Sequence, residues 1–76
     1  MEITVRTWGN LRRFLPGGVD TATVQVPDGA TIDDLTAQLA LEHEVWAVAV
    51  NGEVASFSTT LSPGDHVFLF DNLHGG

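Results

Sequence analysis

Hydrophobic and polar residues alternate near the start of the chain in a way that is typical of β-strands. Residues 2–7 place Ile3 and Val5 on one face and polar residues on the other, and residues 21–26 repeat the alternation. A period of two indicates a strand with one buried face. We expect the two strands to pair as an antiparallel hairpin, with one or two helical turns at residues 10–15 in the connection.

The hydrophobic period changes after a Pro-Asp-Gly turn signal and predicts one amphipathic helix. Thr31 is the predicted N-cap, because its hydroxyl can accept a hydrogen bond from the first free amide groups of a helix. Ile32, Leu35 and Leu39 follow at helical spacing. We expect a helix of about three turns, which is an ordinary length in globular proteins.

The second half of the chain predicts three more strands. Residues 45–50 form a continuous apolar run, which favours a buried central strand. The Asn51-Gly52 turn signal leads into a short partner strand at residues 53–55. Leu61 is the expected core residue of the next loop, and residues 66–70 form the last strand.

This order of elements indicates an α+β domain in two layers, with one main helix on one face of a mixed sheet. A right-handed crossover through the helix brings the first and last strands together in parallel. We therefore expect the β-grasp (ubiquitin-like) layout, with four to five strands. Residues 1–70 are the expected domain, and residues 71–76 are the expected flexible C-terminal tail.

Composition argues against several classes of protein. Ten carboxylate residues against three arginines and no lysine give a net charge of −7, which repels nucleic acid and anionic lipid and favours a basic protein surface. The chain has no cysteine, so a thiolate nucleophile or thiolate-bound metal is excluded. The histidines lack metal-ligand spacing. No apolar run could span a membrane and no signal peptide is visible, so we expect a cytoplasmic protein.

The Gly75-Gly76 ending is the main candidate for chemistry. Glycine has no side chain, so such an end can enter a narrow enzyme channel and bend freely next to the carboxylate. The six residues from Asp71 onward can reach roughly 20 Å when extended. Taken alone, two terminal glycines favour a frayed end that has no function.

Several stretches match, in order, the motifs of one family of proteins. They are Val5–Arg12, Val26–Leu35, Val48–Val54, Leu61–Val67 and the final Gly75-Gly76. The second contains the Pro-Asp-Gly-Ala-Thr entry to the helix, the third contains Val-Asn-Gly, and the fourth contains Pro-Gly-Asp. Together they resemble the ubiquitin-like sulfur carrier proteins, which include the molybdopterin synthase small subunit and the thiamine-pathway sulfur carrier. The likeness covers nearly the whole chain.

The insert at residues 11–15 favours the molybdopterin branch of this family, because the thiamine branch joins its first two strands by a tight turn. The tail departs from that branch. Asp71-Asn72-Leu73-His74 stands where a pair of prolines usually precedes the two glycines, and prolines would stiffen the arm. The acceptor pathway is therefore left open between the molybdenum or tungsten cofactor, thiamine and another sulfur-containing product.

The resemblance implies a carrier and not an enzyme. In such proteins a partner enzyme uses ATP to adenylate the C-terminal carboxylate, here that of Gly76, and sulfur then replaces the adenylate to give a thiocarboxylate. Gly75 supplies flexibility, Leu73 is expected to anchor the tail in a partner channel, and His74 completes the tail. We expect no catalytic side chain, bound cofactor or metal. The expected partners are the adenylating enzyme and a sulfur acceptor such as a molybdopterin synthase large subunit.

Strand parity and the resemblance together indicate a docking surface. Phe68 and Phe70 should point away from the apolar residues that alternate with them. Family members place apolar residues at the positions of Trp8, Val54 and Phe70 against partner enzymes. We predict that Trp8, Val54, Phe68 and Phe70 form the partner interface on the sheet face opposite the helix. The alternative is that Trp8 and one phenylalanine cover a sheet edge or the first helical turns.

Two other functions are consistent with the same residues. A ubiquitin-like modifier joined to target amines needs the same terminus as a sulfur carrier. A β-grasp interaction module with an inert tail needs no terminus at all. Adduct formation and the effect of removing Gly76 discriminate between the three.

Overall fold

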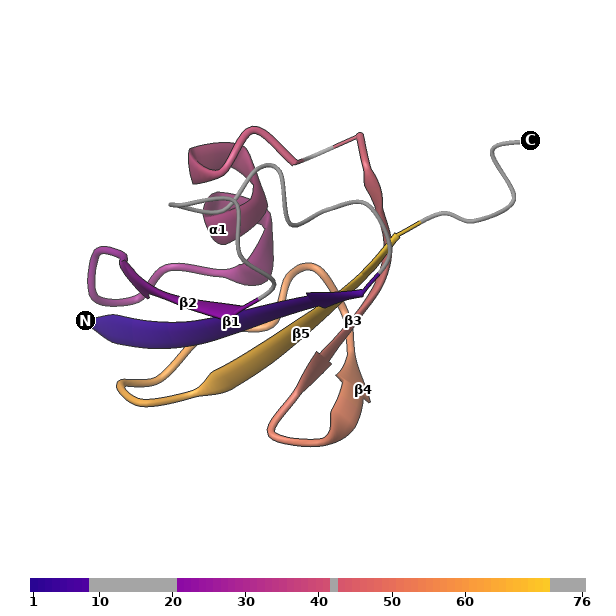
Figure 1. Ribbon diagram of the computed structural model, residues 1–76. Coiled ribbons are helices and arrows are strands. Elements are labelled where there is room, and N and C mark those ends of the chain that lie inside the picture. Colours follow the sequence, from indigo (N-terminus) through magenta and orange to yellow (C-terminus); the bar gives the residue numbers. More distant parts are fainter. Residues whose placement is uncertain (9–20, 42, 72–76) are drawn as a thin grey trace.

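In the computed structural model one helix packs across one face of a five-stranded sheet (Figure 1). The structure describes residues 1–8, 21–41 and 43–71, and the statements below concern these residues. The elements in chain order are β1 (Glu2–Trp8), β2 (Thr21–Gln25), α1 (Ile32–Gln38), β3 (Val45–Val50), β4 (Glu53–Ala55) and β5 (His66–Asp71). The predicted helical turns at residues 10–15 lie outside the described residues.

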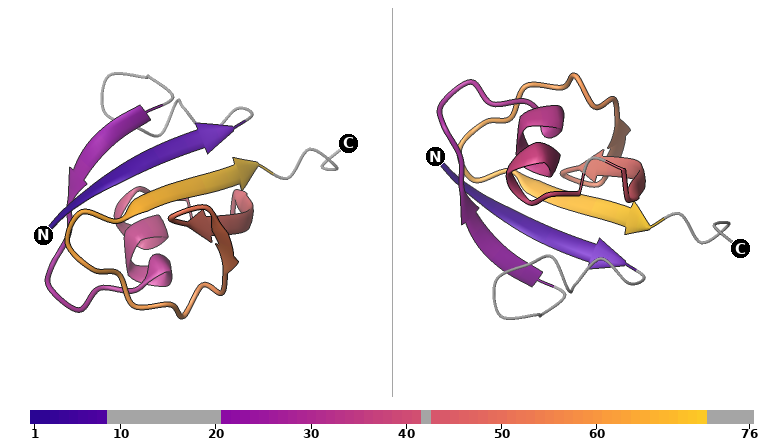
Figure 2. Two further views of the ribbon diagram at one scale, coloured as in Figure 1. Left: turned by 90° about the horizontal axis from the view of Figure 1, so that it is seen from below. Right: turned by 90° about the horizontal axis from the view of Figure 1, so that it is seen from above.

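The strand order of the sheet is β2-β1-β5-β3-β4. β1 pairs with β5 in parallel, and the other neighbouring strands pair antiparallel. The chain reaches β5 only after it has crossed the sheet through α1, as the view from above shows (Figure 2). The predicted α+β class, the β-grasp layout and the parallel contact of the first and last strands are therefore confirmed.

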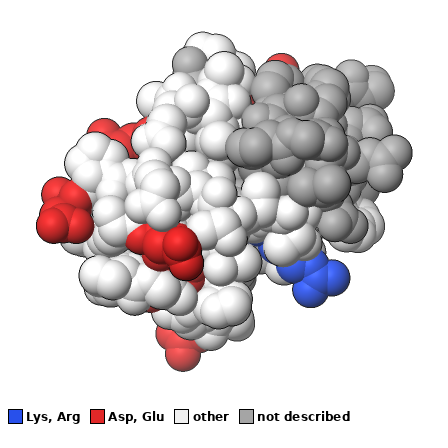
Figure 3. All heavy atoms as spheres, turned by 60° about the vertical axis from the view of Figure 1, so that its left-hand side comes forward, with Lys and Arg blue, Asp and Glu red and all other residues white. Residues whose placement is uncertain are grey.

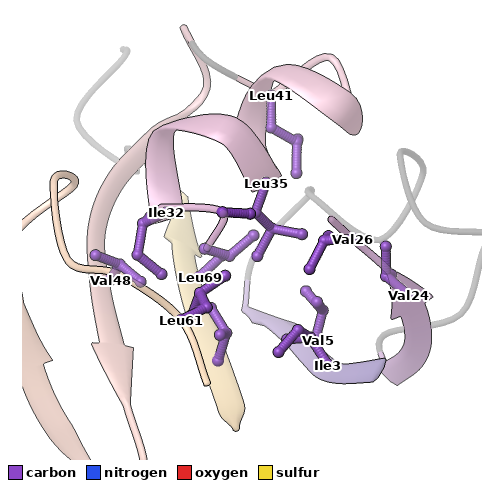
Figure 4. Close-up of a cluster of buried hydrophobic side chains, with 12 residues drawn as sticks. Ile3, Val5, Val24, Val26, Ile32, Leu35, Leu41, Val48, Leu61 and Leu69 are labelled. Carbon is purple, nitrogen blue, oxygen red and sulfur yellow. The ribbon is translucent and has the colours of Figure 1, made fainter. Parts of the chain in front are cut away.

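The core lies between α1 and the sheet face that it covers (Figure 4). Alternate residues of each strand supply one side of this core, and the apolar stripe of α1 supplies the other. Its largest fully buried hydrophobic side chains are Ile3, Val5, Ile32, Leu35, Leu41, Val48, Val67 and Leu69. Leu61 is also buried, as predicted. Each such side chain contributes about 1.5–3 kcal/mol relative to an exposed position.

The helix begins where the sequence predicts. The Asp34 amide donates to Thr31 Oγ1 at 3.2 Å, and the Thr31 amide donates to Asp34 Oδ2 at 2.9 Å. This reciprocal pair is a capping box, which satisfies two amide groups that have no partner inside the helix. Thr31 is therefore confirmed as the N-cap.

The helix is shorter than predicted and ends at Gln38 after about two turns. Ala40 turns left-handed, with φ 59°. Its amide donates to Ala37 O at 3.1 Å, and the Leu41 amide donates to Thr36 O at 2.7 Å. These two bonds form a Schellman motif, in which the left-handed residue is usually glycine. The motif ends the helix while it returns the side chain of Leu41 to the core.

β3 lies inside the sheet, but the prediction of a buried central strand is wrong for most of its residues. Val48 is buried, whereas Ala47 and Ala49 are half-buried and Trp46 is 63% exposed. The reason is that α1 covers only one face of the sheet. An apolar run is therefore compatible with a strand that has one open face. A register shift between Val45 and Ala47 also interrupts the ladder at Trp46.

The β3–β4 hairpin follows the Asn51-Gly52 signal. Asn51 has φ 52° and Gly52 has φ 87°, and a two-residue turn with positive φ at both positions matches the twist of paired strands. The two parallel strands, β1 and β5, run slightly farther than predicted. β1 extends to Trp8, and β5 includes Asp71, which pairs with Val45.

Candidate functional site

Strand pairing brings the predicted partner residues together on the sheet face opposite α1. The parallel register of β1 and β5 sets Arg6 beside Phe68 and Trp8 beside Phe70. β3 continues these two rows with Ala49 and Ala47, and β4 adds Val54 opposite Ala49. We call this surface the open sheet face, and it consists of Arg6, Trp8, Ala47, Ala49, Val54, Phe68 and Phe70.

The four predicted residues differ in how far they are exposed. Val54 is 86% exposed and Trp8 is 53% exposed, whereas Phe68 and Phe70 are half-buried. The two phenyl rings stack with their centroids 4.6 Å apart and their planes 8° from parallel. The rings therefore form a flat apolar platform with Trp8 and Val54 on strands at either side. Exposed aromatic and aliphatic residues gathered in this way are typical of surfaces that bind proteins.

A shallow groove of about 370 Å³ runs along this platform. Its walls include Thr4 and Arg6 from β1, Ala49 from β3, and His66, Phe68 and Phe70 from β5. The guanidinium carbon of Arg6 lies 5.5 Å from the centroid of the Phe68 ring, which is a cation–π distance. Arg6 is not among the residues predicted from sequence, although it lies two residues from Trp8 on β1 and therefore shares its face.

Most carboxylates in the described part of the chain lie away from this face. Asp28, Asp33 and Asp34 belong to the turn before α1 and to its first turn, on the helix side of the sheet. Glu53 and Asp71 stand opposite Val50 and Val45, which pack against the core, so strand pairing directs both to the helix side. In the view of Figure 3 the acidic side chains are scattered and stand apart from the basic one.

The open sheet face adjoins the point where β5 ends. Trp8, Phe70 and Ala47 form the last row of β1, β5 and β3 before Asp71. The four predicted tail residues, Leu73, His74, Gly75 and Gly76, lie outside the described residues. A protein that binds the open sheet face thus contacts the chain within a few residues of the predicted reactive end.

Trp46 is a second exposed aromatic residue that the sequence analysis did not single out. It stands at the register shift of β3, next to Val45, which pairs with Asp71. A β-bulge of this kind redirects a side chain and is common beside binding sites. The exposed tryptophans Trp8 and Trp46 therefore come from the two strands that flank the end of β5.

Within the described ranges, no three His, Asp or Glu residues come together as a metal site. No helix in the part of the chain that the structure describes is long and apolar enough to cross a membrane. The open sheet face offers apolar contact area and one guanidinium, which suits recognition of another protein.

Comparisons with known proteins agree with this architecture. A model of the ThiS family matches residues 5–76 of the chain. No curated protein sequence matches it. Among solved structures, the chain is similar to a protein from Pyrococcus furiosus that is assigned as molybdopterin converting factor subunit 1. The two are 26% identical with a TM-score of 0.75, and the match covers 92% of this chain and 95% of that one.

Two further structures are similar over their whole lengths. Small archaeal modifier protein 1 from Haloferax volcanii is 26% identical with a TM-score of 0.73, and the match covers 100% of both chains. The complex of subunits 1 and 2 of the molybdopterin-converting factor from Helicobacter pylori contains a chain that is 22% identical, with a TM-score of 0.64 and 100% coverage of both chains. At that identity the likeness shows the fold.

Proposed function

Because this chain belongs to the ThiS family, we propose that it is a sulfur carrier whose reactive group is the C-terminal carboxylate of Gly76. An activating enzyme adenylates this carboxylate, and the product is converted to a thiocarboxylate that donates sulfur in cofactor biosynthesis. In this proposal the domain is a protein cosubstrate, and its partners supply the catalytic groups.

The proposed chemistry balances with ATP and a sulfide-level sulfur donor as the only co-reactants. A carboxylate oxygen of Gly76 attacks the α-phosphorus of ATP, and pyrophosphate leaves. The sulfur donor then attacks the carbonyl carbon, and AMP leaves with the bonding electron pair. Activation is needed because a free carboxylate is a poor electrophile, whereas the acyl-adenylate carries a good leaving group.

One observation carries the proposal: the family match runs through to Gly76 and so includes the Gly-Gly end. The fold supports it, because the open sheet face adjoins the last residues of β5. A partner that docks there holds the start of the tail near its own active site. Fixing the two reacting groups close together in this way lowers the entropic cost of the reaction.

We propose molybdopterin as the cofactor that receives the sulfur. The similar Pyrococcus furiosus protein is assigned as a molybdopterin converting factor subunit 1, and the Helicobacter pylori structure is a complex of subunits 1 and 2. The corresponding acceptor for this chain is a large subunit that binds the open sheet face and admits the tail. Phe70, Trp8, Val54 and Phe68 are the proposed contact residues.

A second function is favoured by one comparison. The Haloferax volcanii protein is named a small archaeal modifier protein, and it covers the whole chain at an identity equal to that of the molybdopterin relative. A modifier is joined through its C-terminal carboxylate to a target amine. The same activated Gly76 would serve, with an amine in place of the sulfur donor.

The decisive experiment is intact-mass analysis of the purified chain after incubation with ATP, sulfide and an activating enzyme of the molybdopterin type. We expect a product in which one oxygen is replaced by sulfur, with the change located to Gly76 by fragmentation. The matched controls are the reaction without ATP and the chain that lacks Gly76, both of which should keep their original mass.

An unchanged mass with activating enzymes of both the molybdopterin and the thiamine type, while a known carrier reacts, would contradict the proposal. The modifier function instead predicts higher-mass adducts in a cell lysate that disappear when Gly76 is deleted. If deletion of both glycines alters neither reaction, the domain is an interaction module with an inert tail.

A further inference from the structure

Arg6 is the one lysine or arginine side chain among the described residues, since Arg12 and Arg13 fall outside them. It stands at the β1 end of the row that continues through Phe68, Ala49 and Val54, and it lines the groove of the open sheet face. Its guanidinium lies over the Phe68 ring, and no carboxylate of the described residues forms an ion pair with it. A chain with a net charge of −7 thus presents a cation in the wall of an apolar groove.

Within residues 1–8, 21–41 and 43–71, no carboxylate compensates this cation at close range on its own face. Glu2 is the one carboxylate of β1, and its side chain lies on the same face of the strand as that of Arg6. The two residues are four positions apart, which is about 13 Å along the strand. The Glu2 carboxylate accepts a hydrogen bond from Gln25 Nε2 at 3.4 Å. That spacing exceeds the screening length of about 8 Å at physiological ionic strength, so Glu2 contributes little at Arg6.

We propose that the open sheet face binds a partner protein segment that carries a carboxylate between apolar side chains, and that Arg6 pairs with this carboxylate. The inference rests on the proposed function in one respect, which is that the partner docks on this face. It adds the chemistry of the partner: an acidic residue between apolar side chains, placed opposite β1.

Desolvation is the physical reason for this complementarity. A partner that covers the groove removes water from the guanidinium, and a buried charge without a partner is costly. A carboxylate removes this cost, and the planar guanidinium can donate two parallel hydrogen bonds to its oxygens. The Phe68 ring already contacts the guanidinium, so less side-chain freedom is lost on binding.

Arg6 would therefore act as a specificity residue. Apolar contacts with Phe68, Phe70 and Val54 supply area but tolerate many partners, whereas the charge of Arg6 rejects a surface that places an amide or a lysine opposite it. The net charge of the chain attracts basic protein surfaces at long range. The partner that matches both features has a basic rim and an acidic residue within its apolar contact area.

The test uses three matched peptides and the full ¹⁵N-labelled chain. The peptides are identical heptamers of leucine and valine with glycine-serine ends, and their central residue is Glu, Gln or Lys. Amide shifts in ¹H–¹⁵N spectra report the binding site and the dissociation constant. We expect shifts confined to β1, β3 and β5 around Arg6, and roughly three- to tenfold tighter binding of the Glu peptide than of the Gln peptide, with the Lys peptide weakest.

The charge-reversal variant Arg6→Glu should invert this order, so that the Lys peptide binds best. Arg6→Lys is the matched control, because it keeps the charge and loses the planar donor pair, and it should give an intermediate preference. The exposed position of Arg6 makes both variants compatible with folding, which thermal unfolding would verify.

Equal affinity for the three peptides, shifts on another face, no binding of any peptide at millimolar concentration, or equal shifts with acetate alone would each overturn the inference. Shifts that depend only on the concentration of the protein would identify a second copy as the occupant and would also overturn it. None of these results bears on sulfur transfer at Gly76, which the mass experiment tests by itself.

Discussion

Phe68 and Phe70 lie two residues apart on β5 and stack with parallel rings, 4.6 Å between centroids. Alternate residues of a strand share one face, so β5 builds this pair without help from another strand. The parallel neighbour β1 then places Arg6 and Trp8 directly beside the two rings. The alternation of residues within β5 therefore produces the pair of stacked rings, and the pairing of β5 with the distant strand β1 places the Arg6 cation beside them.

Replacing Phe70 by alanine should reduce docking far more than stability. The ring is half-buried and lies outside the core, whereas large aromatic residues at the centre of an interface commonly contribute about 2 kcal/mol or more to binding. We expect Phe70→Ala to lower kcat/KM for ATP-dependent modification of Gly76 by roughly tenfold or more. Asp33→Ala, on the exposed face of α1, is the control and should leave this rate unchanged. Equal rates for both variants would exclude Phe70 from the interface.

Ala40→Gly should stabilise the protein by about 1 kcal/mol. Ala40 occupies the left-handed position of the Schellman motif with φ 59°, where a Cβ atom is unfavourable and glycine is not. Ala37→Gly is the matched control inside α1, and it should destabilise by about 1 kcal/mol because glycine is a poor helix former. Urea denaturation of both variants measures the difference. A loss of stability in Ala40→Gly would mean that the helix does not end in this motif.

Thr31→Ala and Asp34→Ala should each destabilise the protein by about 1 kcal/mol, because each removes one half of the capping box. The double variant should cost less than the sum of the single variants, since the two side chains act as a reciprocal pair. A double-mutant cycle from urea unfolding gives the coupling energy. Strict additivity would argue that the two hydrogen bonds are independent.

The two buried threonines should respond differently to replacement by valine. Thr7 Oγ1 is buried and has no hydrogen-bond partner among the described residues, whereas Thr36 Oγ1 donates to Asp33 O at 3.0 Å. Thr7→Val should therefore be neutral or stabilising by up to about 1 kcal/mol, and Thr36→Val should be destabilising by a similar amount. Thermal unfolding of the pair is the measurement. A large loss for Thr7→Val would show that its hydroxyl has a partner elsewhere in the chain.

Local patterns were sufficient for most elements and for the candidate surface. Alternation in β1 and β5 predicted which residues face the core, and hence that Phe68 and Phe70 face away from it. The Thr31 cap and the Asn51-Gly52 turn were also found from residue type alone. The physical reason is that side-chain direction in a strand, amide capping and positive φ depend on a few neighbouring residues.

Other features depended on contacts between distant segments. The helix ends early because Leu41 reaches the core through a left-handed Ala40, a residue type that does not mark a helix end in sequence. β3 is apolar on both sides, and only the position of α1 decides which side is open. Its register shift at Trp46 is likewise a property of the ladder with β5.

The sequence by itself thus determined the order of the elements, the two faces of the first and last strands, and the Gly-Gly end that the proposed chemistry requires. The tertiary structure decided that Arg6 stands beside Phe68 and that the open sheet face adjoins the end of β5. The register between strands that are about sixty residues apart in the chain is set by the packing of the whole core, because a slip of one residue would expose every buried side chain of the strand.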